Sequence, residues 1–110
     1  MGFKVDESKV RILKRLQDKI SNIPYPHTSL IGEELIISFK NIVGERTLSV
    51  SVPDKGVYVD GKTWLHVLSR YLDRDSGYFS KDEGSMTIEE ILATVEIFAK
   101  GISGILGEEA

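Results

Sequence analysis

The chain has 110 residues and a net charge of −3, and its hydrophobic and charged fractions, 41% and 28%, are those of an ordinary globular protein. A chain of this length supports one core, so a single domain over residues 1–110 is expected. The absence of cysteine excludes disulfides, thiolate metal sites and cysteine nucleophiles.

The location of the protein is predicted from the same composition. No apolar run approaches the roughly 20 residues that a membrane span requires, and the start of the chain does not resemble a signal peptide. Without cysteine, this favours an intracellular, cytoplasmic protein with no membrane partner. The single Gln, two Asn and two Met point to a thermophilic source.

The predicted elements begin with an amphipathic helix over 7–22, whose apolar residues recur at three- and four-residue spacing. An antiparallel meander follows, with strands at about 28–31, 34–42, 46–52 and 56–60. Alternating residues place one face of this sheet in the core and leave a Ser/Thr-rich face for water or a ligand.

A second helix is expected over 62–74, with Leu65, Leu68 and Leu72 as its inward stripe, and a polar loop over 75–86. A third helix is expected over 87–106, where Thr87 and Glu90 have the spacing of a capping box. The expected fold is therefore α+β, a four-stranded meander with three helices in the order α-ββββ-α-α.

The last helix carries a heptad-like apolar seam, formed by Ile88, Ile91, Val95, Phe98, Ile102 and Ile105. A four-stranded sheet is about 19 Å wide and takes two helices on one face, so the third helix needs another partner. We expect the seam to form an oligomer interface between copies of the chain. The alternative is that it completes the chain's own core.

Residues 56–63, GVYVDGKT, match the phosphate-loop pattern G-x-x-x-x-G-K-[ST] and precede the predicted second helix. Val-Tyr-Val is typical of a strand, and the predicted sheet is antiparallel, whereas that motif needs a parallel sheet. Nucleotide binding is therefore a minor alternative. No cofactor, metal site or catalytic constellation is recognised, so the chain is expected not to be an enzyme.

Basic and aromatic residues gather around the predicted second helix. Lys62, His66, Arg70 and Arg74 recur every four residues and would form one ridge. Cations neutralise phosphates and flat rings stack on unpaired bases, so the pattern favours single-stranded nucleic acid. The alternative is a solvated helix face with the rings in the core. The candidate contacts are Lys40, Arg46, Tyr58, Lys62, Trp64, Arg70, Tyr71, Arg74, Tyr78 and Phe79.

This layout of a small sheet over 34–60, a basic and aromatic groove, and an associating helix over 87–106 resembles the ThermoDBP group of archaeal single-stranded DNA-binding proteins. The resemblance covers most of the chain, carries no diagnostic motif, and implies a homo-oligomer that binds single-stranded DNA without sequence preference. The alternative function is a protein-interaction or regulatory subunit that docks through the C-terminal helix.

Overall fold

A computed structural model describes residues 5–40, 44–73, 75 and 77–109, with the side chains of the last helix described as far as Gly101. The element order is α1 (Glu7–Ile20), β1 (His27–Ile31), β2 (Glu34–Lys40), β3 (Gly44–Ser51), β4 (Tyr58–Val59), β5 (Lys62–Asp73), β6 (Gly77–Thr87) and α2 (Ile88–Glu109). The α+β class is confirmed. The expectation of four strands and three helices is wrong, because the described residues form six strands and two helices.

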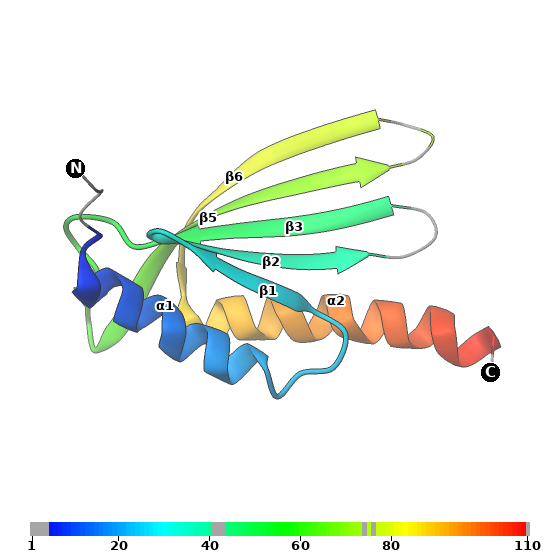
Figure 1. The fold of residues 1–110 in the computed structure, drawn as a ribbon, viewed down its shortest axis with the longest axis horizontal. Helices are drawn as coiled ribbons and strands as arrows, with labels where there is room; N and C mark the ends of the chain where they lie inside the picture. The colour runs from blue at the N-terminus through cyan, green and yellow to red at the C-terminus, as the bar shows by residue number, and fades with distance from the viewer. Residues whose placement is uncertain (1–4, 41–43, 74, 76, 110) are drawn as a thin grey trace.

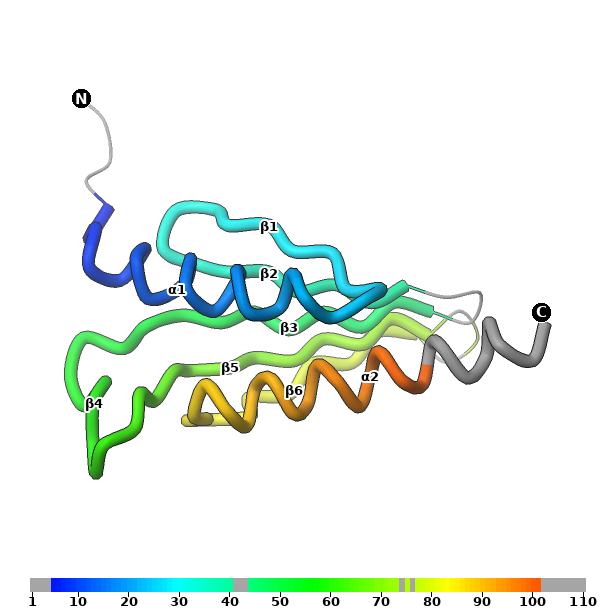
Figure 2. Tube along the Cα trace, turned by 90° about the horizontal axis from the view of Figure 1, so that it is seen from below, coloured from blue at the N-terminus to red at the C-terminus, as the bar shows by residue number. Residues whose placement is uncertain are grey.

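The strands form one antiparallel sheet in which β1, β2, β3 and β5 lie in that order. β6 pairs with β5 from Trp64↔Thr87 to Asp73↔Gly77, and the short β4 pairs with the start of β5. Both helices lie on the same face of the sheet (Figures 1 and 2). The other face is left uncovered by the helices.

The core lies between the helices and the covered face of the sheet. Alternate residues of β2 are buried there, as the period of two in a strand requires, and β3 adds Leu48 and Val50, with Ser49 between them also buried. α1 contributes a stripe at three- and four-residue spacing, Leu13, Leu16 and Ile20, and Asp6 caps its start by accepting the Ser8 N–H at 3.0 Å. The core therefore closes within one chain.

Of the segment predicted as the second helix, 62–74, the described residues Lys62–Asp73 form the longest strand, β5. Every residue from His66 to Asp73 pairs with β3, and Leu65 and Val67 are buried toward the helices. Leu68 and Leu72 lie on the uncovered face, so the leucine spacing that favoured a helix comes from two opposite faces of a strand. Pairing on both sides of β5 outweighs the local pattern.

Most of the segment predicted as a polar loop, 75–86, belongs to β6, which runs from Gly77 to Thr87. Most of its residues are exposed, which explains why it lacks the apolar alternation of a buried strand. A β-bulge interrupts its pairing: Leu68 pairs with Asp82 and Val67 with Gly84, so Glu83 is an extra residue on β6. Gly84 has φ of +74°, a conformation that suits glycine.

The predicted C-terminal helix is confirmed as α2, and so is its capping box: Glu90 accepts the Thr87 N–H at 2.9 Å and its own N–H donates to the Thr87 hydroxyl at 3.1 Å. As far as its side chains are described, the apolar seam that was expected to form an oligomer interface faces the chain's own core. Ile91 and Val95 are fully buried in the chain's own core, and Phe98 packs edge-on against Phe39.

In the described part of the chain, two helices share one face of the sheet, so no surplus helix needs a second copy, and Ile91 and Val95 are not free to form an interface. Ile88 is partly buried against the same core. The side chains of Ile102 and Ile105 lie outside the described residues.

Candidate nucleic-acid interface

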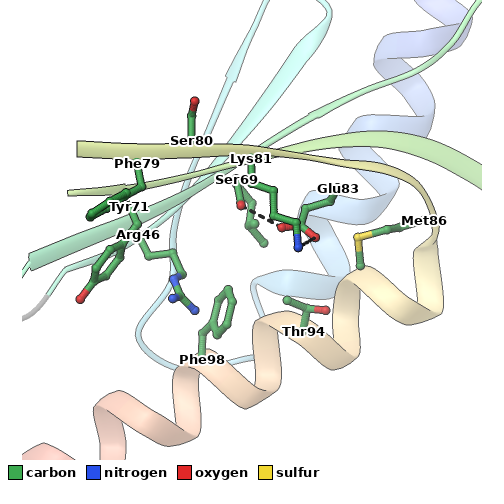
Figure 3. Close-up of a pocket in the computed structure, with 11 residues that line it drawn as sticks. Arg46, Ser69, Tyr71, Phe79, Ser80, Lys81, Glu83, Met86, Thr94 and Phe98 are labelled. Carbon is green, nitrogen blue, oxygen red and sulfur yellow. Dashed lines mark hydrogen bonds and ion pairs between the residues drawn. The ribbon is translucent and has the colours of Figure 1, made fainter. Parts of the chain in front are cut away.

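An open pocket of about 400 Å³ lies between the β5–β6 hairpin and α2 (Figure 3). It lies on the covered side of the sheet, where Thr94 and Phe98 of α2 face the hairpin. Its lining combines three rings, two cations, one carboxylate and several hydroxyls. The residues are Arg46, Leu48, Ser69, Tyr71, Phe79, Ser80, Lys81, Glu83, Met86, Thr94 and Phe98.

Strand register brings these residues together. Tyr71 pairs with Arg46 on one side and with Phe79 on the other, so three side chains from three strands lie in one row. Ser69 pairs with Lys81 in the next row on the same face. α2 supplies Phe98 from below.

Arg46 is held between two rings. Its guanidinium carbon lies 5.1 Å from the Tyr71 ring centroid and 4.4 Å from that of Phe98. The Tyr71 hydroxyl donates to Asp73 at 3.2 Å, which fixes the outer ring. No carboxylate in the described part of the chain forms an ion pair with Arg46, so its positive charge remains available to a ligand.

Phe79 is the exposed ring of the pocket, with 54% of its surface accessible. An exposed ring beside a cation offers a flat surface for stacking. Beside it, the Lys81 ammonium lies 3.9 Å from Glu83 Oε2, and the Ser69 hydroxyl donates to Glu83 Oε1 at 3.0 Å. The pocket therefore has an aromatic, cationic half and a polar half.

Of the residues predicted from sequence, Arg46, Tyr71 and Phe79 meet in this pocket. The even spacing of Lys62, His66 and Arg70 places them on the opposite, uncovered face of β5, since a strand repeats every two residues. Lys62, His66 and Arg70 therefore do not form a helix ridge, and Arg74 lies outside the described residues. Tyr78, 60% exposed, belongs to the uncovered face of β6.

Trp64 lies at the start of β5, where its indole N–H donates to the Val59 carbonyl at 3.2 Å. Tyr58 and Lys62 belong to the same β4–β5 hairpin, roughly 20 Å along the strand from Ser69 at 3.3 Å per residue. Lys40 is exposed at the end of β2, paired in register with Glu45. None of these four residues lines the pocket.

The phosphate-loop match, residues 56–63, is a β-hairpin. Asp60 and Gly61 both have positive φ, 52° and 74°, as in a two-residue hairpin turn, and Val59 pairs with Lys62. Lys62 and Thr63 start a strand instead of a helix, so the helix N-terminal amides that would bind phosphate are absent from this hairpin.

Sequence reasoning missed Lys81 and Glu83, which became site candidates only once 77–87 was recognised as a strand. The Asp60-Gly61 dipeptide, a strong hairpin signal, could have revealed that a strand follows it. Alternation of Phe79, Lys81 and Glu83 would then have placed all three on one face.

On the uncovered face of the sheet, His66 of β5 and Asp82 of β6 form a hydrogen-bonded pair. His66 Nε2 lies 2.8 Å from Asp82 Oδ1, and Asp82 also accepts the Gly84 N–H at 2.8 Å. The Gly84 N–H, and then His66, lower the pKa of Asp82 below its ordinary value. This pair ties β5 to β6 at the bulge.

In the described part of the chain, no helix is long and apolar enough to span a membrane. Comparison with family models, curated proteins and solved structures finds no match to this chain.

Proposed function

We propose that this chain binds single-stranded nucleic acid without sequence preference, and that the pocket between the β5–β6 hairpin and α2 takes one nucleotide of the strand. The observation that carries the proposal is that Arg46, Tyr71 and Phe79 line one open pocket together with Lys81. The pocket, rather than the resemblance to the ThermoDBP group, supports the assignment.

The chemistry of the aromatic half fits an unpaired base. A base stacked on Phe79 gains about 1–3 kcal/mol, and every base has a flat face, so such stacking tolerates any sequence. A base pair inside a duplex does not expose that face. The pocket therefore favours single strands over double strands.

The two cations fit the phosphates on either side of the base. Lys81 lies beside Glu83 at a distance beyond a normal hydrogen bond, and its side chain is 76% exposed, so the ammonium can turn toward a phosphate. Arg46 is fixed by the two rings and presents its charge without further ordering. Two phosphate contacts predict that the logarithm of the association constant falls by about 1.4 per tenfold increase in salt for a single strand, so that log Kd rises by the same amount.

The test is fluorescence anisotropy of the full chain with labelled oligo-dT at low and moderate salt. We expect a Kd of about 10 μM or tighter at low salt, weakening with salt by the slope above. A labelled duplex of the same length is the control and is expected to bind more weakly. Failure of oligo-dT and of other single strands to bind at low salt would reject the proposal.

A second candidate, association with another copy of the chain, has an observation of its own. Ile97 on the outer side of α2 is 66% exposed, and Tyr25 beside a neighbouring pocket is 48% exposed. Sedimentation of the chain and of an Ile97→Glu variant tests it, with the variant expected to be monomeric. A truncation of α2 is unsuitable because Ile91 and Val95 complete the core.

A further inference from the structure

The polar half of the pocket contains a carboxylate where a phosphate-binding site would be expected to hold none. Glu83 lies next to Lys81 and opposite the Arg46 side of the pocket (Figure 3). A carboxylate repels phosphate, so its presence weakens binding unless the ligand brings hydrogen-bond donors to it.

The hydrogen-bonding capacity of Glu83 is only partly used. Its two oxygens can accept about four hydrogen bonds. In the described part of the chain, Ser69 supplies one at 3.0 Å, and the Lys81 ammonium, at 3.9 Å, is too distant for another. Lone pairs on Glu83 therefore remain to accept from a ligand, and the Ser69 hydroxyl can accept as well.

The donor that reaches Glu83 must be common to all nucleotides if the pocket tolerates any base. Base N–H groups differ from base to base, whereas every ribonucleotide carries a 2′-hydroxyl. Carboxylates are also the residues that hold ribose hydroxyls in dinucleotide-binding sites. The Lys81 ammonium lies 3.9 Å from Glu83 Oε2, so a ribose joined to a phosphate at Lys81 lies within reach of Glu83.

We infer that Glu83, oriented by Ser69, accepts a hydrogen bond from the ribose 2′-hydroxyl, so that this pocket prefers single-stranded RNA to single-stranded DNA. This inference rests on the proposed function and specifies its ligand. It assigns the aromatic half to the base, Lys81 to the phosphate and Glu83 to the sugar.

The experiment compares three labelled oligouridylates of one length that differ only at the 2′ position: ribose, deoxyribose and 2′-O-methyl ribose. A hydrogen bond to a charged group predicts that the ribose form binds about tenfold more tightly than the deoxyribose form. The 2′-O-methyl form keeps the oxygen but lacks the donor, so it is expected to bind like the deoxyribose form or more weakly.

Two variants identify the group responsible. Glu83→Ala is expected to abolish the preference for ribose, so that the ribose and deoxyribose forms bind with the same Kd. Asp82→Asn, the adjacent carboxylate on the opposite face of β6, is the matched control and is expected to keep the tenfold ratio. Thermal melting of both variants checks that they fold.

The outcomes separate the inference from the proposed function. Equal binding of the ribose and deoxyribose forms to the unmodified chain, or a ratio that survives Glu83→Ala, would overturn the sugar assignment and leave single-strand binding in place. No binding of either form would overturn both. The 2′-O-methyl comparison needs no variant, so it is decisive even if Glu83→Ala does not fold.

Discussion

The β5–β6 hairpin presents one set of side chains to α2 and the alternate set to the uncovered side of the sheet. Toward α2, Tyr71 and Phe79 stand beside Arg46 in a concave pocket. On the uncovered side, His66 is paired with Asp82 and Lys40 faces Glu45 across the strands. In the described part of the chain, Arg46 on the pocket side lies against two rings and forms no ion pair, whereas His66 and Lys40 on the uncovered side each lie beside an acid.

The difference shows that the face to which a residue points, set by its odd or even position along the strand, matters more for binding than the local composition. Neighbouring residues such as Tyr78 and Phe79 are nearly equally exposed, 60% and 54%, yet face opposite surroundings. The hairpin thus contains its own matched controls, and substitutions on the two faces test the proposed function directly.

The largest effect is expected from the ring pair. Phe79→Ala should weaken binding of a labelled single strand about tenfold or more, because one stacked base loses its partner. Tyr78→Ala, one residue away on the other face, should change the Kd less than twofold. Anisotropy titrations measure both, and an equal loss in the two variants would place the strand on both faces.

A smaller effect is expected from the arginine pair. Arg46→Gln should weaken binding and reduce the magnitude of the salt slope, because one phosphate contact is lost. It should also lower the melting temperature, since its contacts with two rings contribute about 0.5–2 kcal/mol. Arg70→Gln should leave the slope unchanged, and a reduced slope in this variant instead would move the site to the uncovered face.

The Asp82 carboxylate should affect stability but not binding. Its pKa is lowered in the folded state, so its stabilising contribution is complete above the unfolded pKa of about 3.9 and is lost as pH falls through the folded pKa. Asp82→Asn should therefore be less stable than the parent in urea at pH 7. The difference should shrink below about pH 4; a gap that persisted in acid would point to a cause other than this charge.

The smallest effect concerns Trp64. Its indole is engaged with the Val59 carbonyl at the other end of β5, so its fluorescence should not change when a single strand occupies the pocket. Iodide quenching with and without oligonucleotide measures this. Protection of the indole by the oligonucleotide would show that the strand extends over the uncovered face.

Sequence reasoning anticipated α1, the strands β1 to β3 and α2, because each has a clear period and a clear boundary signal. It failed over β5, where Leu65 and Leu68 have helical spacing although they lie on opposite faces of the strand. The error then spread, because β6 has little apolar pattern of its own and is specified by its pairing with β5.

The sequence predicted which kinds of side chain form the candidate site, but not where in the fold they meet. Arg46, Tyr71 and Phe79 were selected for charge and ring type, and these properties do not depend on the element that carries them. Trp64 and Tyr71, seven residues apart, would share a face of a helix but lie on opposite faces of a strand. The pocket residues could therefore be separated from the others only after the parity of β5 was known.

Because Glu83 is the extra residue of the β6 bulge, its carboxylate can be gained or lost independently of the rest of the strand. Because Leu68 pairs with Asp82 and Val67 with Gly84, removing Glu83 would join two paired rows without changing the inward or outward direction of any other side chain. A deletion of one codon would thus remove the acid while Phe79 and Lys81 kept their places. Gain or loss of this single residue would therefore change the chemistry of the pocket without shifting the register between β5 and β6.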